Sequence, residues 1–453
     1  MEAIKYYSTN LKAPAVSFKK ALLKGQAPDK GLYMPDCFPV LEKSTMDAFS
    51  KMRYPEVAFV VLHAFLKHEV PADTLRLLVN DAYDYSVPLE HVCDRKYVMR
   101  LDQGPTASFK DFAARMMGRL MNHFLMKEKR DLLILTATSG DTGSAIANAF
   151  YGLDNIRVLI LFPEKEVTVR QRKQMTTLGK NVEVIAVDGK FDDCQAMVKR
   201  AFADPDLATL NLSSANSINI GRLLPQAVYY FFAWSQLRKN TDEQAIFLVP
   251  SGNFGDMMGG MIAREMGLPV RQMGIAVNEN DEFPVFLNTG EYQKIEPSKN
   301  CISSAMNVGH PSNLSRLVAL YGGVMDEKGR IEKIPDMIAM RKDMVAFSIT
   351  DAETRQCIAD AWHAHRLLLE PHGAVGWAGL QKYLAMNEGM DKDQLFVVLE
   401  TAHPAKFPEQ IQEILKFDPD LPPSLQGLED KEEKYGFLKH QYEDFKKHLT
   451  GMR

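Results

Sequence analysis

The chain has few cysteines for its length, and none of them lie close together. Among 453 residues there are five, namely Cys37, Cys93, Cys194, Cys301 and Cys357. An odd number of scattered thiols argues against a disulfide framework or a zinc site, and it favours a reducing compartment. His363 and His365 are two residues apart, but no Cys or carboxylate pattern completes a metal site around them, so no metal is predicted.

Long apolar runs and dense basic tracts are missing as well. The apolar runs are too short to span a bilayer, and the first residues contain no apolar segment of the secretory type. The formal net charge is -4, and without a basic cluster nucleic acid is not expected as a partner. We therefore expect a cytoplasmic protein that binds neither membranes nor nucleic acid.

The composition that remains is typical of a globular protein, with 46% apolar and 25% charged residues. Helical patterns over residues 55–66 and 71–80 predict a mainly helical N-terminal unit over residues 1–95. Beyond it, short strand-like runs alternate with amphipathic helical patterns, which predicts an α/β fold with mostly parallel sheets. The runs are residues 132–135, 158–162, 182–187, 246–249, 274–277 and 395–399. We expect α/β units over residues 96–240 and 241–453, with a charged, helix-like stretch after residue 421 packed at the periphery.

The segment QGPTASFKDF, residues 103–112, places a lysine at the start of a helical pattern. Thr106 or Ser108 is expected to cap this helix, which puts Lys110 in the first turn. A cation is unfavourable there because the helix N-terminus is already positive. A lysine that carries a Schiff base, or that is nucleophilic through a lowered pKa, suits the position. The alternative is a solvated lysine paired with Asp102 or Asp111.

Two strand-to-helix turns are built of small residues. In LTATSGDTGS, residues 135–144, and in FLVPSGNFGDMMGG, residues 247–260, backbone N–H groups and hydroxyls would meet the positive end of a helix. Such a turn binds carboxylate or phosphate. The second turn matches neither the GxxxxGK[ST] nor the GxGxxG pattern. For each turn the alternative is a tight turn without a ligand.

Two further segments follow strands. In VLETAHPAKF, residues 398–407, Thr401 would lie at the carboxyl end of a strand, where ligands bind in open α/β sheets. His403 is a candidate base there, and an ordinary loop histidine is the alternative. NLSSANSINIGR, residues 211–222, is dense in amides and hydroxyls and ends in an arginine, so it could recognise a phosphorylated substrate or be a plain polar loop.

Taken in order, these segments resemble the threonine synthase family of the tryptophan-synthase-β-like fold, whose members use pyridoxal 5'-phosphate (PLP). The matching blocks are GPTASFKD (104–111), TATSGDTG (136–143) with FYG (150–152), FDDCQAMVK (191–199), SANSINI (214–220), VPSGNFGD (249–256) and TAHPAKF (401–407). The likeness covers nearly the whole chain. It implies two open, mostly parallel sheet domains with a helical N-terminal extension, and PLP as the cofactor.

The resemblance also implies roles for individual residues. Lys110 would form the Schiff base with PLP, Thr401 would face the pyridine nitrogen, and Asp141 would lie near the phenolic oxygen. The cofactor phosphate would be held by Ser251, Gly252, Asn253, Phe254, Gly255 and Asp256. The substrate carboxylate would be bound by Thr138, Ser139, Gly140 and Thr142, and the substrate phosphate by Asn216, Ser217, Asn219 and Arg222. A segment with Lys165, Arg170 and Gln171 could close over the substrate.

The implied reaction converts O-phospho-L-homoserine and water to L-threonine and phosphate, in a monomer or a small homo-oligomer. One residue departs from the family pattern, because Gln103 stands where a histidine is common. A phospho-lyase that yields 2-oxobutyrate, ammonia and phosphate is therefore the nearest alternative. A non-catalytic protein that binds PLP or phosphorylated ligands is a third, although the intact Lys110 argues against it.

Overall fold

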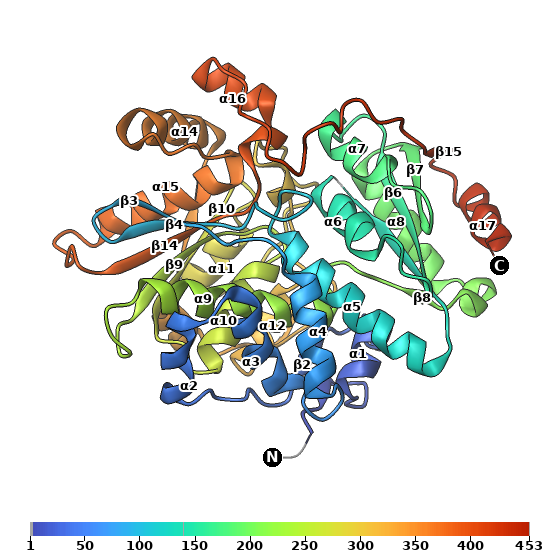
Figure 1. Ribbon diagram of the computed structural model, residues 1–453, viewed down its shortest axis with the longest axis horizontal. Coiled ribbons are helices and arrows are strands. Elements are labelled where there is room, and N and C mark those ends of the chain that lie inside the picture. The colour runs from blue at the N-terminus through green and yellow to red at the C-terminus, as the bar shows by residue number, and fades with distance from the viewer. Residues whose placement is uncertain (1–2, 139, 453) are drawn as a thin grey trace.

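The computed structural model describes residues 3–138 and 140–452, and two sheets organise it (Figure 1). The larger sheet has six strands in the order β13-β10-β9-β14-β4-β3. All neighbours pair in parallel except β3, which forms an antiparallel hairpin with β4. The strands are β3 (Leu89–Cys93), β4 (Lys96–Arg100), β9 (Ala245–Pro250), β10 (Val270–Val277), β13 (Met344–Ser348) and β14 (Leu395–Glu400).

The smaller sheet has five strands in the order β15-β7-β6-β5-β8, all parallel. Its β5 (Leu132–Ala137) and β6 (Ile156–Pro163) are almost entirely buried, as expected where helices cover both faces. The remaining strands are β7 (Val182–Asp188), β8 (Leu212–Ser213) and β15 (Gly436–Lys439). The predicted parallel α/β architecture is confirmed.

Helices surround both sheets. In the N-terminal part they are α1 (Phe18–Lys24), α2 (Lys43–Ala48), η1 (Phe49–Lys51), α3 (Tyr54–Leu66) and α4 (Ala72–Ala82). Around the smaller sheet lie α5 (Lys110–Glu128), α6 (Asp141–Phe150), α7 (Val169–Thr176), α8 (Phe191–Ala203), η2 (Pro205–Leu210) and α17 (Tyr442–Gly451). The others are η3 (Ile220–Arg222), η4 (Leu224–Gln226), α9 (Ala227–Leu237), α10 (Gly255–Glu265), α11 (Glu282–Thr289), η5 (Ser304–Met306), α12 (Leu314–Leu320), α13 (Met337–Asp343), α14 (Asp351–His365), α15 (Pro371–Met386), η6 (Pro404–Lys406) and α16 (Pro408–Leu415).

The N-terminal part packs its helices onto the rest through aromatic residues. The ring of Tyr54 on α3 meets those of Tyr83, Phe112 and Phe232 edge-on at 5.0–5.3 Å. The helices predicted over residues 55–66 and 71–80 are present within two residues of the expected bounds. Two short antiparallel pairs complete this description, namely β1 (Tyr6–Ser8) with β2 (Tyr33–Pro35), and β11 (Val324–Met325) with β12 (Ile331–Lys333).

The end of the chain differs from the helix-like pattern expected after residue 421. Residues 436–439 form β15, which adds to the edge of the smaller sheet beside β7. The following α17 buries Tyr442, Phe445 and Leu449 in the same apolar cluster as α8. In Figure 1 this segment runs from the larger sheet across to the far side of the smaller one. The chain thus returns to the smaller sheet after completing the larger one.

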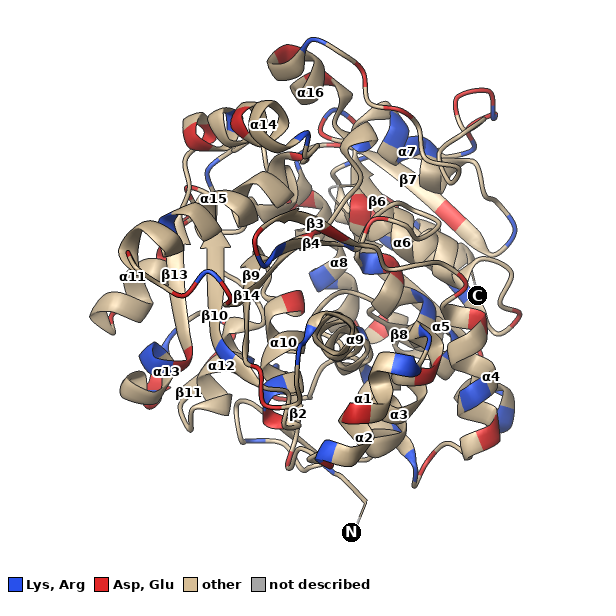
Figure 2. Cartoon of the chain, turned by 60° about the vertical axis from the view of Figure 1, so that its left-hand side comes forward, with Lys and Arg blue, Asp and Glu red and all other residues tan. Residues whose placement is uncertain are grey.

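Charge is distributed without a single dominant sign. Figure 2 shows basic and acidic residues together on the outer helices α4, α13 and α14. In the described part of the chain, no helix is both long and apolar enough to cross a membrane. Nor do the described residues gather three His, Cys, Asp or Glu side chains into a possible metal cluster.

Candidate active site

A cavity of about 570 Å³ lies where loops from both sheets meet. Its walls come from the segments that follow β5, β9 and β14, so it lies at the carboxyl ends of those strands, where α/β folds bind ligands. Most of the site residues predicted from the sequence line it. They are Lys110, Thr138, Asp141, Thr142, Asn216, Ser217, Arg222, Gly252, Asn253, Phe254, Gly255, Asp256 and Thr401.

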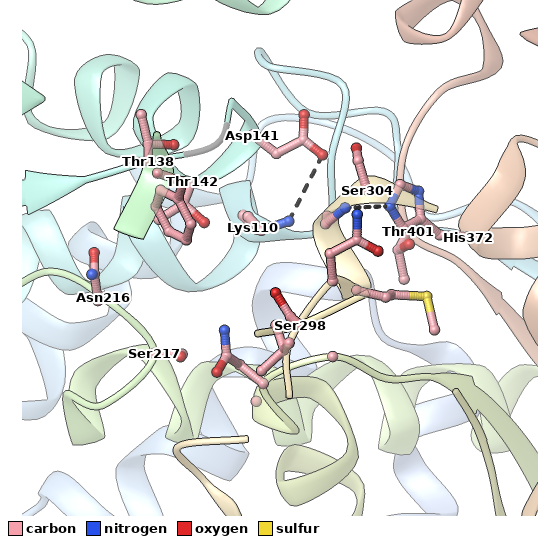
Figure 3. A pocket seen from close by; sticks show the side chains of 18 of the residues that line it. Lys110, Thr138, Asp141, Thr142, Asn216, Ser217, Ser298, Ser304, His372 and Thr401 are labelled. Atoms are coloured by element: carbon pink, nitrogen blue, oxygen red, sulfur yellow. Dashed lines mark hydrogen bonds and ion pairs between the residues drawn. The ribbon is translucent and has the colours of Figure 1, made fainter. Parts of the chain in front are cut away.

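Lys110 is the first residue of α5 and points into the cavity (Figure 3). The segment before it is tied to the end of β14, because the Phe109 N–H donates to the Thr401 carbonyl at 2.9 Å and the His403 N–H donates to the Ala107 carbonyl at 3.0 Å. Burial lowers the pKa of Lys110 from its usual value, although Asp141 opposes this. A buried lysine is uncharged for a larger fraction of the time than a lysine exposed to solvent.

The start of α5 differs from the expectation in one respect. Neither Thr106 nor Ser108 caps the helix, whose N-cap is Phe109 without a side-chain bond. Instead Asp111 accepts hydrogen bonds from the Thr106 hydroxyl at 2.6 Å and the Thr106 N–H at 2.8 Å. Asp111 is therefore hydrogen-bonded to the loop before the helix. The carboxylate that faces Lys110 is that of Asp141, whose Oδ2 lies 3.8 Å from the Lys110 Nζ.

Asp141 is buried at the start of α6. Its Oδ1 accepts a hydrogen bond from Gln171 Nε2 at 3.0 Å and lies 2.6 Å from the Nζ of Lys406, which is fully buried. Burial alone would raise the pKa of Asp141, but Lys406 and then Lys110 hold it well below its usual range. The site therefore contains an ionised carboxylate between two lysines.

The turn between β5 and α6 is organised by Thr138. Its Oγ1 accepts hydrogen bonds from the Gly140 N–H at 2.9 Å and the Gly143 N–H at 2.8 Å. Gly140 has a φ of 134°, a conformation that other residues rarely adopt. Thr138 and Thr142 line the cavity, whereas Gly140 does not. Ser139, predicted to bind the substrate carboxylate, lies outside the described residues.

The loop between β9 and α10 has free donors. Among described residues, the backbone N–H groups of residues 252–255 donate to no protein acceptor. The Ser251 Oγ is buried close to Asp256, and no described residue lies in good hydrogen-bond geometry to it. A Cβ on Gly252 would lie 3.0 Å from the Ala305 carbonyl oxygen and the Met306 Cα, so this wall is closely packed. Unpaired donors at the N-terminus of an eleven-residue helix fit a phosphate group, such as that of PLP.

Asp256 lies beside these donors, and its acidity is altered. Burial raises its pKa to about 7, against the hydrogen bond that its Oδ1 accepts from the Met257 N–H at 2.8 Å and the charge of Lys110. The folded protein therefore favours the protonated carboxyl, while the unfolded chain ionises near the ordinary value of 3.8. The contribution of Asp256 to stability is consequently most favourable at low pH and becomes less favourable as the pH rises from about 4 toward 7.

We expect the substitution Asp256→Asn to stabilise the cofactor-free protein in a pH-dependent way. At about 1.4 kcal/mol for each tenfold change in proton affinity, the ionisation penalty reaches roughly 4 kcal/mol above pH 7. The gain in unfolding free energy over the unsubstituted protein should be near zero at pH 4, grow to pH 7 and then level off. Urea unfolding at several pH values measures it, and a gain independent of pH would contradict the account.

The polar segment before α9 contributes three cavity residues and one structural residue. Arg222 is buried, and its Nη1 donates to the Ala215 carbonyl at 2.7 Å. Its Nε has no hydrogen-bond partner in the described part of the chain. Burial lowers the pKa of Arg222 to about 10. Asn216 and Ser217 also line the cavity, but Asn219 does not, because its amide donates to the carbonyls of Leu22 and Ser214. An unpaired buried cation at a cavity wall is suited to bind an anion.

Thr401 directly follows β14 and lines the cavity, next to His372 and Ser304 in Figure 3. His372 Nε2 accepts a hydrogen bond from the Ala305 N–H at 3.0 Å, so its proton lies on Nδ1, which donates to Glu370. Glu400, buried behind Thr401, accepts from the Glu370 N–H at 3.0 Å. This series of hydrogen bonds, from Ala305 through His372 and Glu370 to Glu400, holds the wall opposite the β5–α6 turn in place.

Several predicted residues do not line the cavity. Gln103 donates to Asp102 at 2.7 Å, His403 accepts from the Ala405 N–H, and Arg170 donates to the Ala405 carbonyl. Together with Lys165, Ser251, Gly140 and Asn219 they are not among the lining residues, whereas Gln171 is. Sequence patterns missed other lining residues, namely Glu166, Lys190, Gln226, Pro297, Ser298, Asn300, residues 304–308 and His372. None of these lies in a turn that was predicted to bind an anion. Phe191, Asp192 and Gln195 also line the cavity, and they belong to the block 191–199 that resembles the family, but no site role was predicted for them.

Family models and known proteins match this arrangement. A model described as "Pyridoxal-phosphate dependent enzyme" matches residues 87–401, "Threonine synthase N terminus" matches residues 5–83, and "Threonine synthase, C-terminal" matches residues 373–449. The chain is 37% identical over 423 residues to the threonine synthase of Escherichia coli K12, covering 93% of this chain and 94% of the relative. It is 36% identical to that of Pseudomonas aeruginosa, with 97% and 96% covered.

Solved structures agree with the sequence matches. The PLP-bound threonine synthase from Brucella melitensis superposes with a TM-score of 0.91 at 34% identity, covering 99% of both chains. The yeast threonine synthase gives a TM-score of 0.90 at 29% identity, covering 98% of both chains. The expected fold and the expected cofactor, PLP, are thus confirmed. The chain belongs to the threonine synthase family of PLP-dependent enzymes.

Proposed function

We propose that the protein converts O-phospho-L-homoserine and water to L-threonine and phosphate at the Lys110 cavity. The observation that carries this proposal is one cavity that joins a buried lysine of lowered pKa, a loop of free N–H donors and an unpaired arginine. PLP, when bound, supplies the electron sink that acidifies the C–H bond of the amino-acid substrate. The residues of the chain then bind, orient and move protons.

Lys110 is proposed as the base of the reaction. Net conversion removes one Cβ proton and the Cγ phosphate, adds the water oxygen at Cβ and a proton at Cγ, and leaves Cα with the hydrogen count it had. A neutral amine at Lys110 Nζ can take the Cα proton and return it, and the lowered pKa supports this role. With its Nζ inside the cavity, one lysine can serve several proton transfers in turn.

Three other groups are proposed to hold the ligands. The free N–H groups of residues 252–255 and the Ser251 hydroxyl would bind the cofactor phosphate. Thr138 and Thr142, with the start of α6, would bind the substrate carboxylate. Arg222, with Asn216 and Ser217, would bind the substrate phosphate. Thr401 would face the pyridine nitrogen, as a neutral hydroxyl suits a ring that stays largely unprotonated.

The second candidate, a phospho-lyase, was suggested by Gln103. The side chain of Gln103 is exposed, is hydrogen-bonded to Asp102 and does not line the cavity. This position supports the addition of water to give threonine over the release of 2-oxobutyrate. We expect Gln103→His to leave the ratio of threonine to 2-oxobutyrate unchanged within about twofold, because surface substitutions away from a site have small effects. Chromatography of both products measures the ratio. A tenfold change would show that Gln103 reaches the reacting atoms.

The experiment that tests the proposed function measures three products together. The purified protein with PLP is incubated with O-phospho-L-homoserine, and phosphate, threonine and 2-oxobutyrate are quantified over time. Equal amounts of phosphate and threonine are expected. Phosphate with an equal amount of 2-oxobutyrate and no threonine would establish the lyase, and the absence of all three products would favour a non-catalytic binder.

We further propose a reducing compartment such as the cytoplasm and a monomer or small homo-oligomer. The five cysteines are all free thiols, and Cys194, Cys301 and Cys357 are buried. Such scattered thiols persist where disulfides are kept reduced.

A further inference from the structure

Lys406 is a second buried lysine beside Lys110, and it has no assigned role. It lies at the end of η6, and its side chain is fully buried. Its Nζ lies 2.6 Å from Asp141 Oδ1 and donates to the Thr106 carbonyl at 2.9 Å. Lys110 is on the opposite carboxylate oxygen, 3.8 Å from Oδ2, which is beyond hydrogen-bond distance.

The two lysines therefore share one carboxylate unequally. Lys406 makes the close, hydrogen-bonded ion pair with Asp141, and such pairs are the strong ones in a buried site. The pair is close to neutral as a unit. Lys110 is left with a longer electrostatic contact to Asp141, without a hydrogen bond, in a setting where burial already disfavours its charged form.

We propose that Lys406 is a positioning residue that engages Asp141 so that Lys110 remains a neutral amine, able to bond the cofactor and to act as a base. Without Lys406, the carboxylate would be free to pair with Lys110. Lys110 would then stay protonated at neutral pH and could do neither task. This inference rests on the role proposed for Lys110 in the reaction.

Other charged groups around Lys110 fit this arrangement. Arg222 on η3 and Lys406 itself disfavour the protonated form of Lys110, while Asp256 on α10 and Asp141 favour it. Lys406 in turn faces Asp141, Asp111 and His403. Burial raises the pKa of Asp256 to about 7, so its charge develops toward the upper part of the tested pH range. Asp141 stays ionised throughout and is the charged neighbour with the larger influence on Lys110, so its pairing with Lys406 is the contact that the test addresses.

The test compares Lys406→Met with the double variant Lys406→Met/Asp141→Asn in the full-length protein. For each, PLP binding is titrated by absorbance between pH 6 and pH 9, and the pH dependence of kcat is measured. In the single variant we expect PLP affinity at pH 7 to fall by at least about tenfold and to recover toward pH 9. The ascending limb of kcat should move up by at least about one pH unit. The double variant should return the pH midpoints of PLP binding and of kcat to near those of the unsubstituted protein, whatever its absolute PLP affinity and turnover, because Asp141 itself lines the cofactor cavity.

Lys382→Met is the matched control. Lys382 also joins an ion pair and a backbone carbonyl, at 2.8 Å from Glu353 and 2.8 Å from the Ser348 oxygen, but it lies outside the cavity. It should leave both midpoints unchanged. Unchanged pH midpoints in Lys406→Met, or midpoints in the double variant that stay shifted as far as in the single one, would overturn the proposal. If Lys406→Met does not fold, Lys406→Gln replaces it in the same comparison.

The same measurements separate this inference from the proposed function. If the unsubstituted protein releases no phosphate from O-phospho-L-homoserine, the proposed reaction fails. The PLP titration still reports whether Lys406 sets the protonation of Lys110.

Discussion

We expect Lys110→Ala to remove both the covalent attachment of PLP and the catalytic reaction. Lys110 is the cavity lysine at the start of α5, and burial lowers its pKa, which favours the neutral amine that such attachment needs. Loss of the nucleophile and base should reduce threonine formation by at least about 10³-fold. The absorbance band near the visible–ultraviolet border should also be lost or replaced by that of unattached PLP.

Lys190 provides the comparison for this prediction. It also lines the cavity, from the residue that precedes α8 on the opposite side of the substrate space. Lys190→Ala should retain the absorbance band of attached PLP, whatever its effect on turnover. If Lys110→Ala retained the original band and Lys190→Ala lost it, the result would show that PLP is attached to Lys190 and not to Lys110.

The second large effect is expected from Arg222→Met. The guanidinium is buried, its Nε has no partner, and it lines the cavity, so it is poised for an anionic ligand. A buried charged hydrogen bond contributes on the order of 2–3 kcal/mol, which predicts about a 10²-fold fall in kcat/KM for O-phospho-L-homoserine. Steady-state kinetics measures the fall, which we expect to appear mainly in KM.

Asn219→Ala separates ligand binding from support of the fold. Asn219 lies on the same segment but outside the cavity, and its amide joins the Leu22 and Ser214 carbonyls. Its loss should lower thermal stability and leave KM nearly unchanged.

In Arg222→Met, by contrast, the absorbance of bound PLP and the melting temperature should stay close to the values of the unsubstituted protein. An unchanged kcat/KM in that variant would show that the substrate phosphate binds elsewhere.

Local patterns in the sequence predicted several of the segments that line the cavity. Lys110 and the turns after β5 and β9 each combine a strand end, small residues and a helix start within about ten positions. Such features depend on near neighbours in the chain, so they are visible without the fold. Thr401 was found for the same reason, because the run of residues 395–399 indicates where its strand ends.

Contacts between distant segments were not predictable in this way. The pairing of Lys406 with Asp141 joins η6 to α6, and the bond from Ala305 to His372 joins η5 to α15. The helix cap expected from Thr106 failed because its hydroxyl donates to Asp111 instead. The strand at residues 436–439 escaped notice because its pattern is short, mixed in polarity and set by the edge of β7. Each outcome depends on a tertiary partner.

The most direct test of the account identifies the residue that holds PLP. The purified enzyme is reduced with borohydride, digested, and its peptides are examined by mass spectrometry. The cavity offers Lys110 and Lys190, with Lys406 buried behind its wall. We predict the phosphopyridoxyl group on the peptide containing Lys110. A label on Lys406 or Lys190, or no label in enzyme that makes threonine, would contradict the account.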